Sequence, residues 1–251
     1  MSSPKPTIVF APGAWHTPDC FDIVREQLHS QGWETEAVTY PSVGAEPPTQ
    51  GLQGDADAVR EVVAKLADEG KKVVLAVHSY GGLVGAEASK GLGFQQRKRE
   101  GKDGGITMLV YLAAFVTPVG KSIKMMLGGQ FLPWMNFKGE YVHADEPHKV
   151  FYADVDPELQ EKSIKALKHQ SAPVFTDCVT YEPWHEIECM YLMCEKDQAL
   201  FAQVQEMMIQ MLGEKAPVYK CNSSHSPFLS MPEEVVKGLE MAAKVGEERA
   251  S

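Results

Sequence analysis

Short apolar runs alternate with longer amphipathic stretches along most of the chain. The runs are rich in β-branched residues and carry little polar alternation, which is typical of parallel strands buried on both faces. We predict strands at Thr7–Ala11, Trp33–Tyr40, Val73–Val77, Met108–Ala114, Met190–Cys194 and Pro217–Lys220. Between them we predict helices at Thr17–Ser30, Leu52–Glu69, a segment ending near Ser89, Ala199–Leu212 and Glu233–Lys244. Strand alternating with helix predicts an α/β fold with a doubly wound, mostly parallel sheet.

Two stretches interrupt this alternation. Gln95–Gly105 is charged and glycine-rich, so we expect a solvated surface loop there. Pro118–Pro183 is far longer than a crossover between two strands requires. It contains helical spacing near His148–Ala153 and Pro157–His169. Such an insertion would lie beyond the carboxyl ends of the strands, where ligands bind in open α/β sheets.

The long insertion suggests how the chain is organised. We expect residues 1–117 and 184–251 to form the α/β core, with residues 118–183 inserted as a helical cap over the active site. The hydrophobic pattern by itself would equally allow a second small domain of unknown role.

Composition excludes several classes of protein. A formal net charge of −10 would repel a phosphate backbone, so nucleic-acid binding is not expected. The five cysteines form no CxxC pair, which argues against a zinc ribbon and favours free thiols in a reducing compartment. The amino terminus lacks the features of a signal peptide, and no apolar stretch is long enough to span a membrane. We therefore expect a cytoplasmic, soluble protein that acts on a small molecule; the sequence leaves a homodimer open.

Ser79 is the strongest candidate for a nucleophile. It follows the buried run Val73–Val77 and precedes a helix, which is the strand–serine–helix order of a nucleophile elbow. This sharp turn needs small neighbours, and Gly81 and Gly82 supply them. The residue two before the serine is usually glycine, but here it is Val77. An ordinary serine in a β–α turn is the alternative interpretation.

A serine hydroxyl needs a base, and the base needs an acid that fixes its tautomer. A nucleophile elbow is followed along the chain first by the acid and then by the histidine. Of the eight histidines, His225 suits this order best, because it follows the last predicted strand and precedes the final helix. Glu195 and Asp197 both follow the strand before it. We favour Asp197, because it lies beyond the strand's end, whereas Glu195 would face outward.

An oxyanion hole requires two donors aimed at the developing negative charge. The backbone N–H of Tyr80, directly after the serine, should be one donor. The turn after the first strand should supply the other from Ala14, because Gly13 lets the backbone bend closely there.

These motifs together resemble the α/β-hydrolase superfamily over nearly the whole chain. More narrowly, the chain is similar to the branch that holds plant methyl esterases, hydroxynitrile lyases and their fungal and bacterial relatives. The matching segments are Ile8–His16, Val77–Gly82, Tyr191–Asp197 and Ser224–Leu229. The resemblance implies a triad of Ser79, Asp197 and His225, with Ala14 and Tyr80 as oxyanion donors.

Departures from the branch bear on the reaction. The branch usually has His-Gly where this chain has Pro12-Gly13. Hydroxynitrile lyases have threonine at the position of Gly13 and lysine directly after the catalytic histidine, where this chain has Ser226. Without that lysine to hold a cyanide-like anion, we expect hydrolysis rather than cyanohydrin cleavage.

Three functions remain open at this point. The leading hypothesis is a carboxylic-ester or lactone hydrolase that works through an acyl-enzyme. The same triad could instead cleave a carbon–carbon bond, or carry out a cyclase or dehydratase step on a polyketide-like substrate, since the fold alone does not decide. The third hypothesis is a non-catalytic member that binds a small ligand.

Apolar residues of the insertion are suited to a hydrophobic acyl or aromatic group, although they would serve equally to pack the cap onto the core. We expect the substrate pocket to be lined by Gly13, Trp15, His16, Met126, Phe131, Trp134 and Met135. The sequence contains no phosphate-binding loop, metal-ligand cluster or Rossmann fingerprint, so it implies neither a metal nor another cofactor.

Overall fold

A parallel β-sheet forms the centre of the molecule, which we describe from a computed structural model covering residues 4–250. The strands of the sheet are β1 (Thr7–Ala11), β2 (Thr35–Ala37), β3 (Lys72–His78), β4 (Gly105–Leu112), β8 (Cys189–Cys194) and β9 (Val218–Cys221). The six strands lie in the order β2-β1-β3-β4-β8-β9, and every neighbouring pair is parallel. The predicted doubly wound parallel sheet is confirmed.

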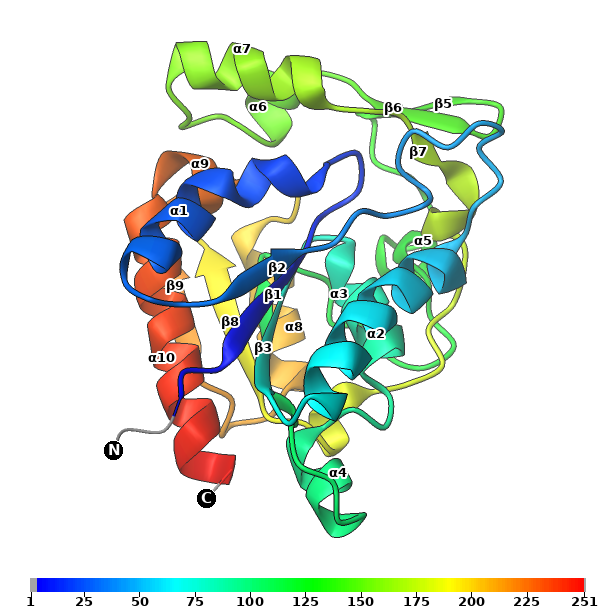
Figure 1. The fold of residues 1–251 in the computed structure, drawn as a ribbon. Coiled ribbons are helices and arrows are strands. Elements are labelled where there is room, and N and C mark those ends of the chain that lie inside the picture. Colours follow the sequence, from blue (N-terminus) through cyan, green and yellow to red (C-terminus); the bar gives the residue numbers. More distant parts are fainter. Residues whose placement is uncertain (1–3, 251) are drawn as a thin grey trace.

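Helices cover both faces of this sheet (Figure 1). They are η1 (Pro18–Phe21), α1 (Asp22–Ser30), α2 (Leu52–Asp68), α3 (Gly81–Ser89), α4 (Phe94–Arg99), α8 (Ala202–Met211), α9 (Pro227–Ser230) and α10 (Pro232–Ala250). Helices α1 and α10 pack together on one face, and α2 and α3 pack together on the other. The central strands β3 and β4 are accordingly mostly apolar and buried along almost their whole length, as strands covered on both faces must be. No helix within residues 4–250 is long and apolar enough to cross a bilayer.

Most of the long insertion forms a layer at the top of the molecule in Figure 1, beyond the carboxyl ends of the parallel strands. The elements of the insertion are α5 (Ile123–Met126), β5 (Met135–Lys138), β6 (Tyr141–Ala144), α6 (Pro147–Val150), α7 (Pro157–Ala166), β7 (Gln170–Ser171) and η2 (Ala172–Phe175). The short helix η3 (Pro183–His185), where the insertion rejoins the core, lies instead near the amino ends of β4 and β8. Two of the helices lie where helical spacing predicted them. The antiparallel sheet β5-β6-β7 was not predicted, and it corrects the expectation of a purely helical cap. Its strands have four residues at most, too few to show a clear alternation.

The charged stretch expected to be a surface loop contains a helix instead. Helix α4 occupies Phe94–Arg99, and the side chain of Arg97 is buried against the core. The Arg97 guanidinium donates to the Asp68 carboxylate at 2.8 Å and to the backbone carbonyl of Gly104 at 3.2 Å. The prediction was wrong because Arg97, one charged residue of the run, is itself buried and pairs with Asp68 of α2, which the local sequence does not reveal.

The contact between β3 and α3 explains why valine stands where nucleophile elbows usually carry glycine. A Cβ atom added to Gly85 would lie 2.5 Å from Cγ1 of Val77, so the helix can approach this strand only because position 85 has no side chain. A Cβ on Gly82 would lie 2.1 Å from the carbonyl oxygen of Phe115. The space that a glycine in the strand would leave is supplied here by glycines in the helix.

Gly85→Ala therefore should destabilise the protein, although alanine normally favours a helix over glycine. We expect overpacking against Val77 to lower the free energy of unfolding by about 1–3 kcal/mol in urea titrations. Adding Val77→Ala removes the clashing methyl group, so the double variant should lose less than the two single losses combined.

Gly54→Ala in α2 is the matched control, because the nearest atom to its new Cβ would be 3.4 Å away. We expect this control to gain up to about 1 kcal/mol. A Gly85→Ala variant as stable as the Gly54→Ala control would contradict the proposed close packing.

Candidate active site

Ser79 lies on the sharp turn between β3 and α3, with a left-handed backbone φ of +53°. Such a conformation costs a non-glycine residue about 1–3 kcal/mol and persists only where its surroundings fix it. The Ser79 carbonyl accepts hydrogen bonds from the N–H of Gly82 at 3.0 Å and of Phe115 at 3.1 Å. These two bonds hold the turn, and the partly exposed side chain of Ser79 faces a cavity that His225 also lines.

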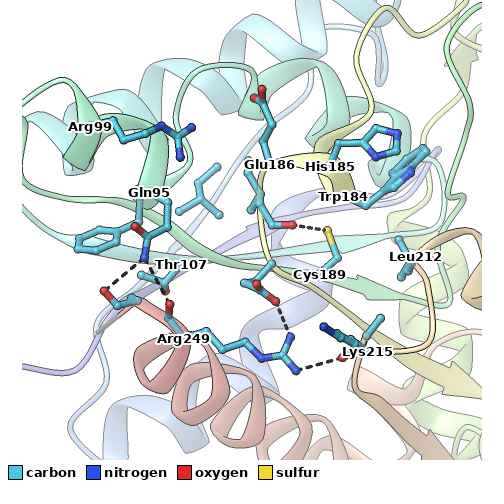
Figure 2. Close-up of a pocket in the computed structure, with 17 residues that line it drawn as sticks. Gln95, Arg99, Thr107, Trp184, His185, Glu186, Cys189, Leu212, Lys215 and Arg249 are labelled. Atoms are coloured by element: carbon cyan, nitrogen blue, oxygen red, sulfur yellow. Dashed lines mark hydrogen bonds and ion pairs between the residues drawn. The ribbon is translucent and has the colours of Figure 1, made fainter.

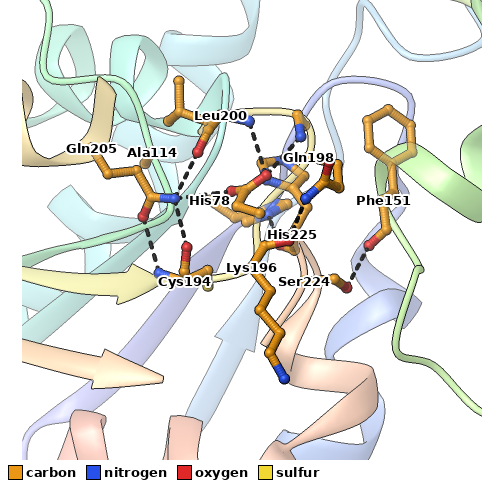
Figure 3. Close-up of polar contacts among 12 residues, drawn as sticks. His78, Ala114, Phe151, Cys194, Lys196, Gln198, Leu200, Gln205, Ser224 and His225 are labelled. Atoms are coloured by element: carbon orange, nitrogen blue, oxygen red, sulfur yellow. Dashed lines mark hydrogen bonds and ion pairs between the residues drawn. The ribbon is translucent and has the colours of Figure 1, made fainter. Parts of the chain in front are cut away.

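His225 and Asp197 form a buried hydrogen bond of 2.7 Å between Nδ1 and Oδ2 (Figure 3). The second carboxylate oxygen of Asp197 accepts from the N–H groups of Ala199 at 2.7 Å and Leu200 at 2.8 Å. An ionised carboxylate can only accept, so Nδ1 of His225 carries the proton of this bond. Nε2 is then left as the basic nitrogen.

Gln205 on α8 is a buried residue of this site that the sequence analysis missed. Its side-chain amide donates to Oδ2 of Asp197 at 3.2 Å and to the carbonyl of Leu200 at 2.7 Å. The same side chain exchanges two hydrogen bonds with the backbone of Cys194, each 3.0 Å long (Figure 3). Gln205 therefore fixes the loop that carries Asp197, whereas Glu195 on that loop is exposed.

The loop that carries His225 is held from two sides. The His225 carbonyl accepts a hydrogen bond of 2.9 Å from Nε2 of His78. A carbonyl can only accept, so this nitrogen of His78 carries the proton. Asp154, in the segment predicted to form the cap, accepts from the N–H of Ser224 at 2.8 Å and also from its hydroxyl. The His225 ring is thus set between the core strand β3 and the inserted layer.

The two predicted oxyanion donors lie at the same cavity as Ser79. Within residues 4–250, neither the N–H of Ala14 nor that of Tyr80 donates a hydrogen bond to another protein group. Gly13 allows this arrangement, because a Cβ there would lie 2.8 Å from Nδ1 of His78 and 3.1 Å from Cβ of Ser79. Two backbone donors are therefore available beside the serine.

The cavity at Ser79 has a volume of about 30 Å³ and an almost entirely apolar wall. It is lined by Ala14, Trp15, Ser79, Tyr80, Phe115, Ile123, Leu127, Leu132, Trp134, Met135, Phe175, Ala199, Leu200 and His225. Of the residues predicted for the pocket, Trp15, Trp134 and Met135 are present. The others, Gly13, His16, Met126 and Phe131, do not line it.

Other residues at α5 line the cavity in place of Met126. Ile123 and Leu127, one helical turn apart, both line it, whereas Met126 packs against the core without lining the cavity. Phe131 stacks instead on Phe137, with ring centroids 4.2 Å apart.

His16 lies behind the oxyanion turn rather than in the cavity. Its Nδ1 donates to the carbonyl of Ala14 at 2.8 Å, and the Tyr152 hydroxyl donates to its Nε2 at 2.8 Å. Both bonds fit the neutral ring. Burial lowers the pKa of His16 from 6.5 to about 4, although the hydrogen bond to the Ala14 carbonyl acts in the opposite direction.

A larger hollow of about 350 Å³ lies at the amino ends of β4 and β8, away from Ser79 (Figure 2). Arg249 crosses it and pairs with Glu188. The hollow is also lined by Cys189, whose thiol donates to the carbonyl of Ile187 at 3.3 Å. Burial raises the pKa of this thiol well above its usual value. The hollow therefore offers no activated nucleophile. Within residues 4–250, no group of three or more His, Cys, Asp or Glu side chains is placed to hold a metal ion.

Sequence comparison relates the chain to hydrolases. The model of the alpha/beta hydrolase family matches residues 8–237. The alpha/beta hydrolase nvfD of Aspergillus novofumigatus is 32% identical over 248 residues, which cover 95% of this chain and 97% of that protein. A probable hydrolase, R7, from a Phoma species is 26% identical over 247 residues, covering 92% and 95% of the two chains.

Solved structures share the fold at lower identity. A pyrethroid hydrolase from Sphingobium faniae superposes with a TM-score of 0.75 at 20% identity, covering 97% of this chain and 99% of its own. A methylesterase from Arabidopsis gives a TM-score of 0.75 at 19% identity, with coverages of 96% and 99%. Polyneuridine aldehyde esterase gives 0.75 at 16% identity, with coverages of 95% and 99%.

The low pKa of His16 should make stability depend on pH. The unfolded chain binds a proton at this histidine near pH 6.5, whereas the folded chain does so only near pH 4. The contribution of neutral His16 to the free energy of unfolding is therefore complete above pH 6.5. It is lost as the pH falls toward 4, by about 1.4 kcal/mol per pH unit. We expect urea titrations between pH 7 and 4 to show a steeper loss for the wild type than for His16→Gln. Parallel curves for the two proteins would contradict a buried neutral His16.

Proposed function

Because the chain belongs to the alpha/beta hydrolase family, we propose that it is a serine hydrolase that cleaves a small, hydrophobic carboxylic ester or lactone through an acyl-enzyme. The observation that carries this proposal is one apolar cavity that brings together Ser79, His225 and two unoccupied backbone N–H groups. The buried carboxylate of Asp197 lies directly behind the histidine.

Each group has a role in the proposed reaction. Nε2 of His225 takes the proton from the Ser79 hydroxyl, whose oxygen attacks the substrate carbonyl carbon. The N–H groups of Ala14 and Tyr80 stabilise the oxyanion of the tetrahedral intermediate. When the intermediate collapses, the protonated His225 gives its proton to the departing alkoxide. A water molecule, activated by the same nitrogen, then hydrolyses the acyl-enzyme.

The role of Asp197 is to hold the imidazole in the tautomer that leaves Nε2 basic, and to stabilise the imidazolium that forms. Ala199, Leu200 and Gln205 together place donors on both of its oxygens. The carboxylate is therefore fixed in orientation before the substrate arrives.

The cavity wall supports a neutral, apolar substrate. The cavity lining contains no Asp, Glu, Lys or Arg side chain. Four aromatic residues, Trp15, Phe115, Trp134 and Phe175, line the cavity together with the serine. A volume of about 30 Å³ holds little more than a water molecule. Side chains of the inserted layer must therefore move apart to admit an acyl group. The names of the structural relatives, which include a pyrethroid hydrolase and a methylesterase, support hydrolysis of esters.

Ser79→Ala should abolish hydrolysis of a short-chain aryl ester. We expect kcat to fall by about 10⁴-fold or more, since the nucleophile is lost while the cavity is only slightly enlarged. Release of the phenol, followed by absorbance, measures the rate. An alanine variant with wild-type activity would show that Ser79 is not the nucleophile.

Asp197→Asn and Glu195→Gln distinguish the two acids of the same loop. The first change should lower kcat by roughly 10³- to 10⁴-fold, because the amide no longer fixes the productive tautomer of His225. The second should leave kcat within about twofold, since the Glu195 side chain is exposed. The reverse ranking would assign the acid to Glu195.

A further inference from the structure

A continuous chain of buried hydrogen bonds connects the two turns that carry the proposed oxyanion donors. The N–H of Trp15, next to Ala14, donates to Oε1 of Gln170 at 3.0 Å. Nε2 of Gln170 donates to the Ser42 hydroxyl, which donates to Oδ2 of Asp55. The hydroxyl of Tyr80 donates to the same Asp55 oxygen at 2.7 Å. All five residues are buried.

The chemistry of the end groups fixes the direction of every bond. A backbone N–H can only donate, so Trp15 must face the carbonyl oxygen of the Gln170 amide. The amide nitrogen of Gln170 must then donate to Ser42, whose own proton is left for Asp55. No member of the chain can be reversed without leaving a buried donor or acceptor unpaired, which costs about 1–3 kcal/mol.

The peptide bond between Ala14 and Trp15 is held at both ends. Its N–H donates to Gln170, and its carbonyl accepts from Nδ1 of His16. Trp15 has a left-handed φ of +68°, which a tryptophan adopts only under constraint. Its own carbonyl accepts from the N–H of Lys168 at 3.0 Å, and its indole N–H donates to the carbonyl of Val142 at 2.9 Å. The backbone beside the Ala14 donor is therefore fixed largely from the inserted layer.

Asp55 of α2 accepts the last hydrogen bond of this series on the core side. It is fully buried on α2, and within residues 4–250 no cation forms an ion pair with it. Its carboxylate instead accepts from the N–H of Ser42 at 3.0 Å, from the Ser42 hydroxyl and from the Tyr80 hydroxyl. Burial raises the pKa of this carboxyl, and the hydrogen bonds from Ser42 and Tyr80 act in the opposite direction. A buried carboxylate is costly, so its presence calls for a role beyond packing.

We propose that Gln170 and Asp55 are positioning residues for the oxyanion hole, holding the Ala14 and Tyr80 donors at a fixed separation. This inference rests on the proposed hydrolase function. Gln170 lies on β7, so the inserted layer supplies one link of this hydrogen-bond series and helps to order the oxyanion turn. The layer then contributes to transition-state stabilisation as well as to the substrate cavity.

Two variants interrupt the chain without touching the triad. Gln170→Met keeps the length of the side chain but removes both hydrogen bonds, so the Ala14 turn loses its tie to the core. Tyr80→Phe removes one hydroxyl and leaves the backbone N–H of residue 80 in place. We expect kcat/KM for an aryl ester to fall about 10- to 100-fold in the first and about 10-fold in the second, less than complete loss of an oxyanion donor would cost.

Tyr40→Phe is the matched control. The Tyr40 ring is buried 5.8 Å from that of Tyr80, but its hydroxyl has no hydrogen-bond partner among the residues described. Like Tyr80→Phe, this change removes one buried phenolic hydroxyl from the same region, but it breaks none of the connected hydrogen bonds. We expect this control to keep kcat/KM within about twofold, as substitutions that break no interaction do.

Affinity for an alkylboronic acid separates positioning from general damage to the fold. Boronic acids form a tetrahedral, anionic adduct with the serine and so depend on the oxyanion hole, whereas KM in large part reports ground-state binding. Rates are normalised to the fraction of molecules that a fluorophosphonate finally labels, and thermal midpoints are recorded for each variant. We expect boronate affinity to weaken by the same factor as kcat/KM, with KM little changed.

The outcomes separate this inference from the function on which it rests. If the wild type hydrolyses the ester but Gln170→Met and Tyr80→Phe match the Tyr40→Phe control in rate and boronate affinity, the positioning role is wrong and the hydrolase function stands. If the wild type neither hydrolyses esters nor binds the boronate, the proposed function fails and this inference fails with it. Should Gln170→Met not fold, Tyr80→Phe alone decides between these results.

Discussion

The turn that takes the chain from β3 into α3 constrains much of the surrounding structure. Ser79 must adopt a left-handed conformation at this turn, and the helix must start against the ends of two neighbouring strands. A Cβ on Gly81 would lie 2.7 Å from the carbonyl oxygens of both Ala11 and Pro12, so no larger residue fits there. The same closeness brings the turn after β1 next to the serine. The cavity and its two backbone donors follow from this one close contact.

Most of the core could be predicted from the sequence, because its strands are buried and their apolar runs are unbroken. The errors fell where tertiary contacts decide the structure. Helix α4 forms in a charged segment because Arg97 is buried and pairs with Asp68 on a distant helix. The strands β5 and β6 are short and lack a clear hydrophobic period, so their antiparallel pairing within the sheet β5-β6-β7 defines them.

The candidate site shows the same division between local and long-range information. Ser79 and His225 belong to motifs that local order makes visible, and the position of Asp197 follows from the end of a strand. Gln205 and Gln170 carry no local signal, since glutamine is usually a surface residue. Their roles arise from partners far along the chain, such as Trp15, which is 155 residues from Gln170. A buried amide becomes informative only when the groups that it joins are known.

The central claim is that Ser79 is an activated nucleophile, and covalent labelling by a fluorophosphonate tests it most directly. The account predicts one adduct per chain in the intact mass, located by peptide mapping at Ser79. It also predicts that labelling slows when His225 is replaced by alanine, because no base remains to take the hydroxyl proton. An unlabelled wild type, or an adduct that maps to another residue, would contradict the account.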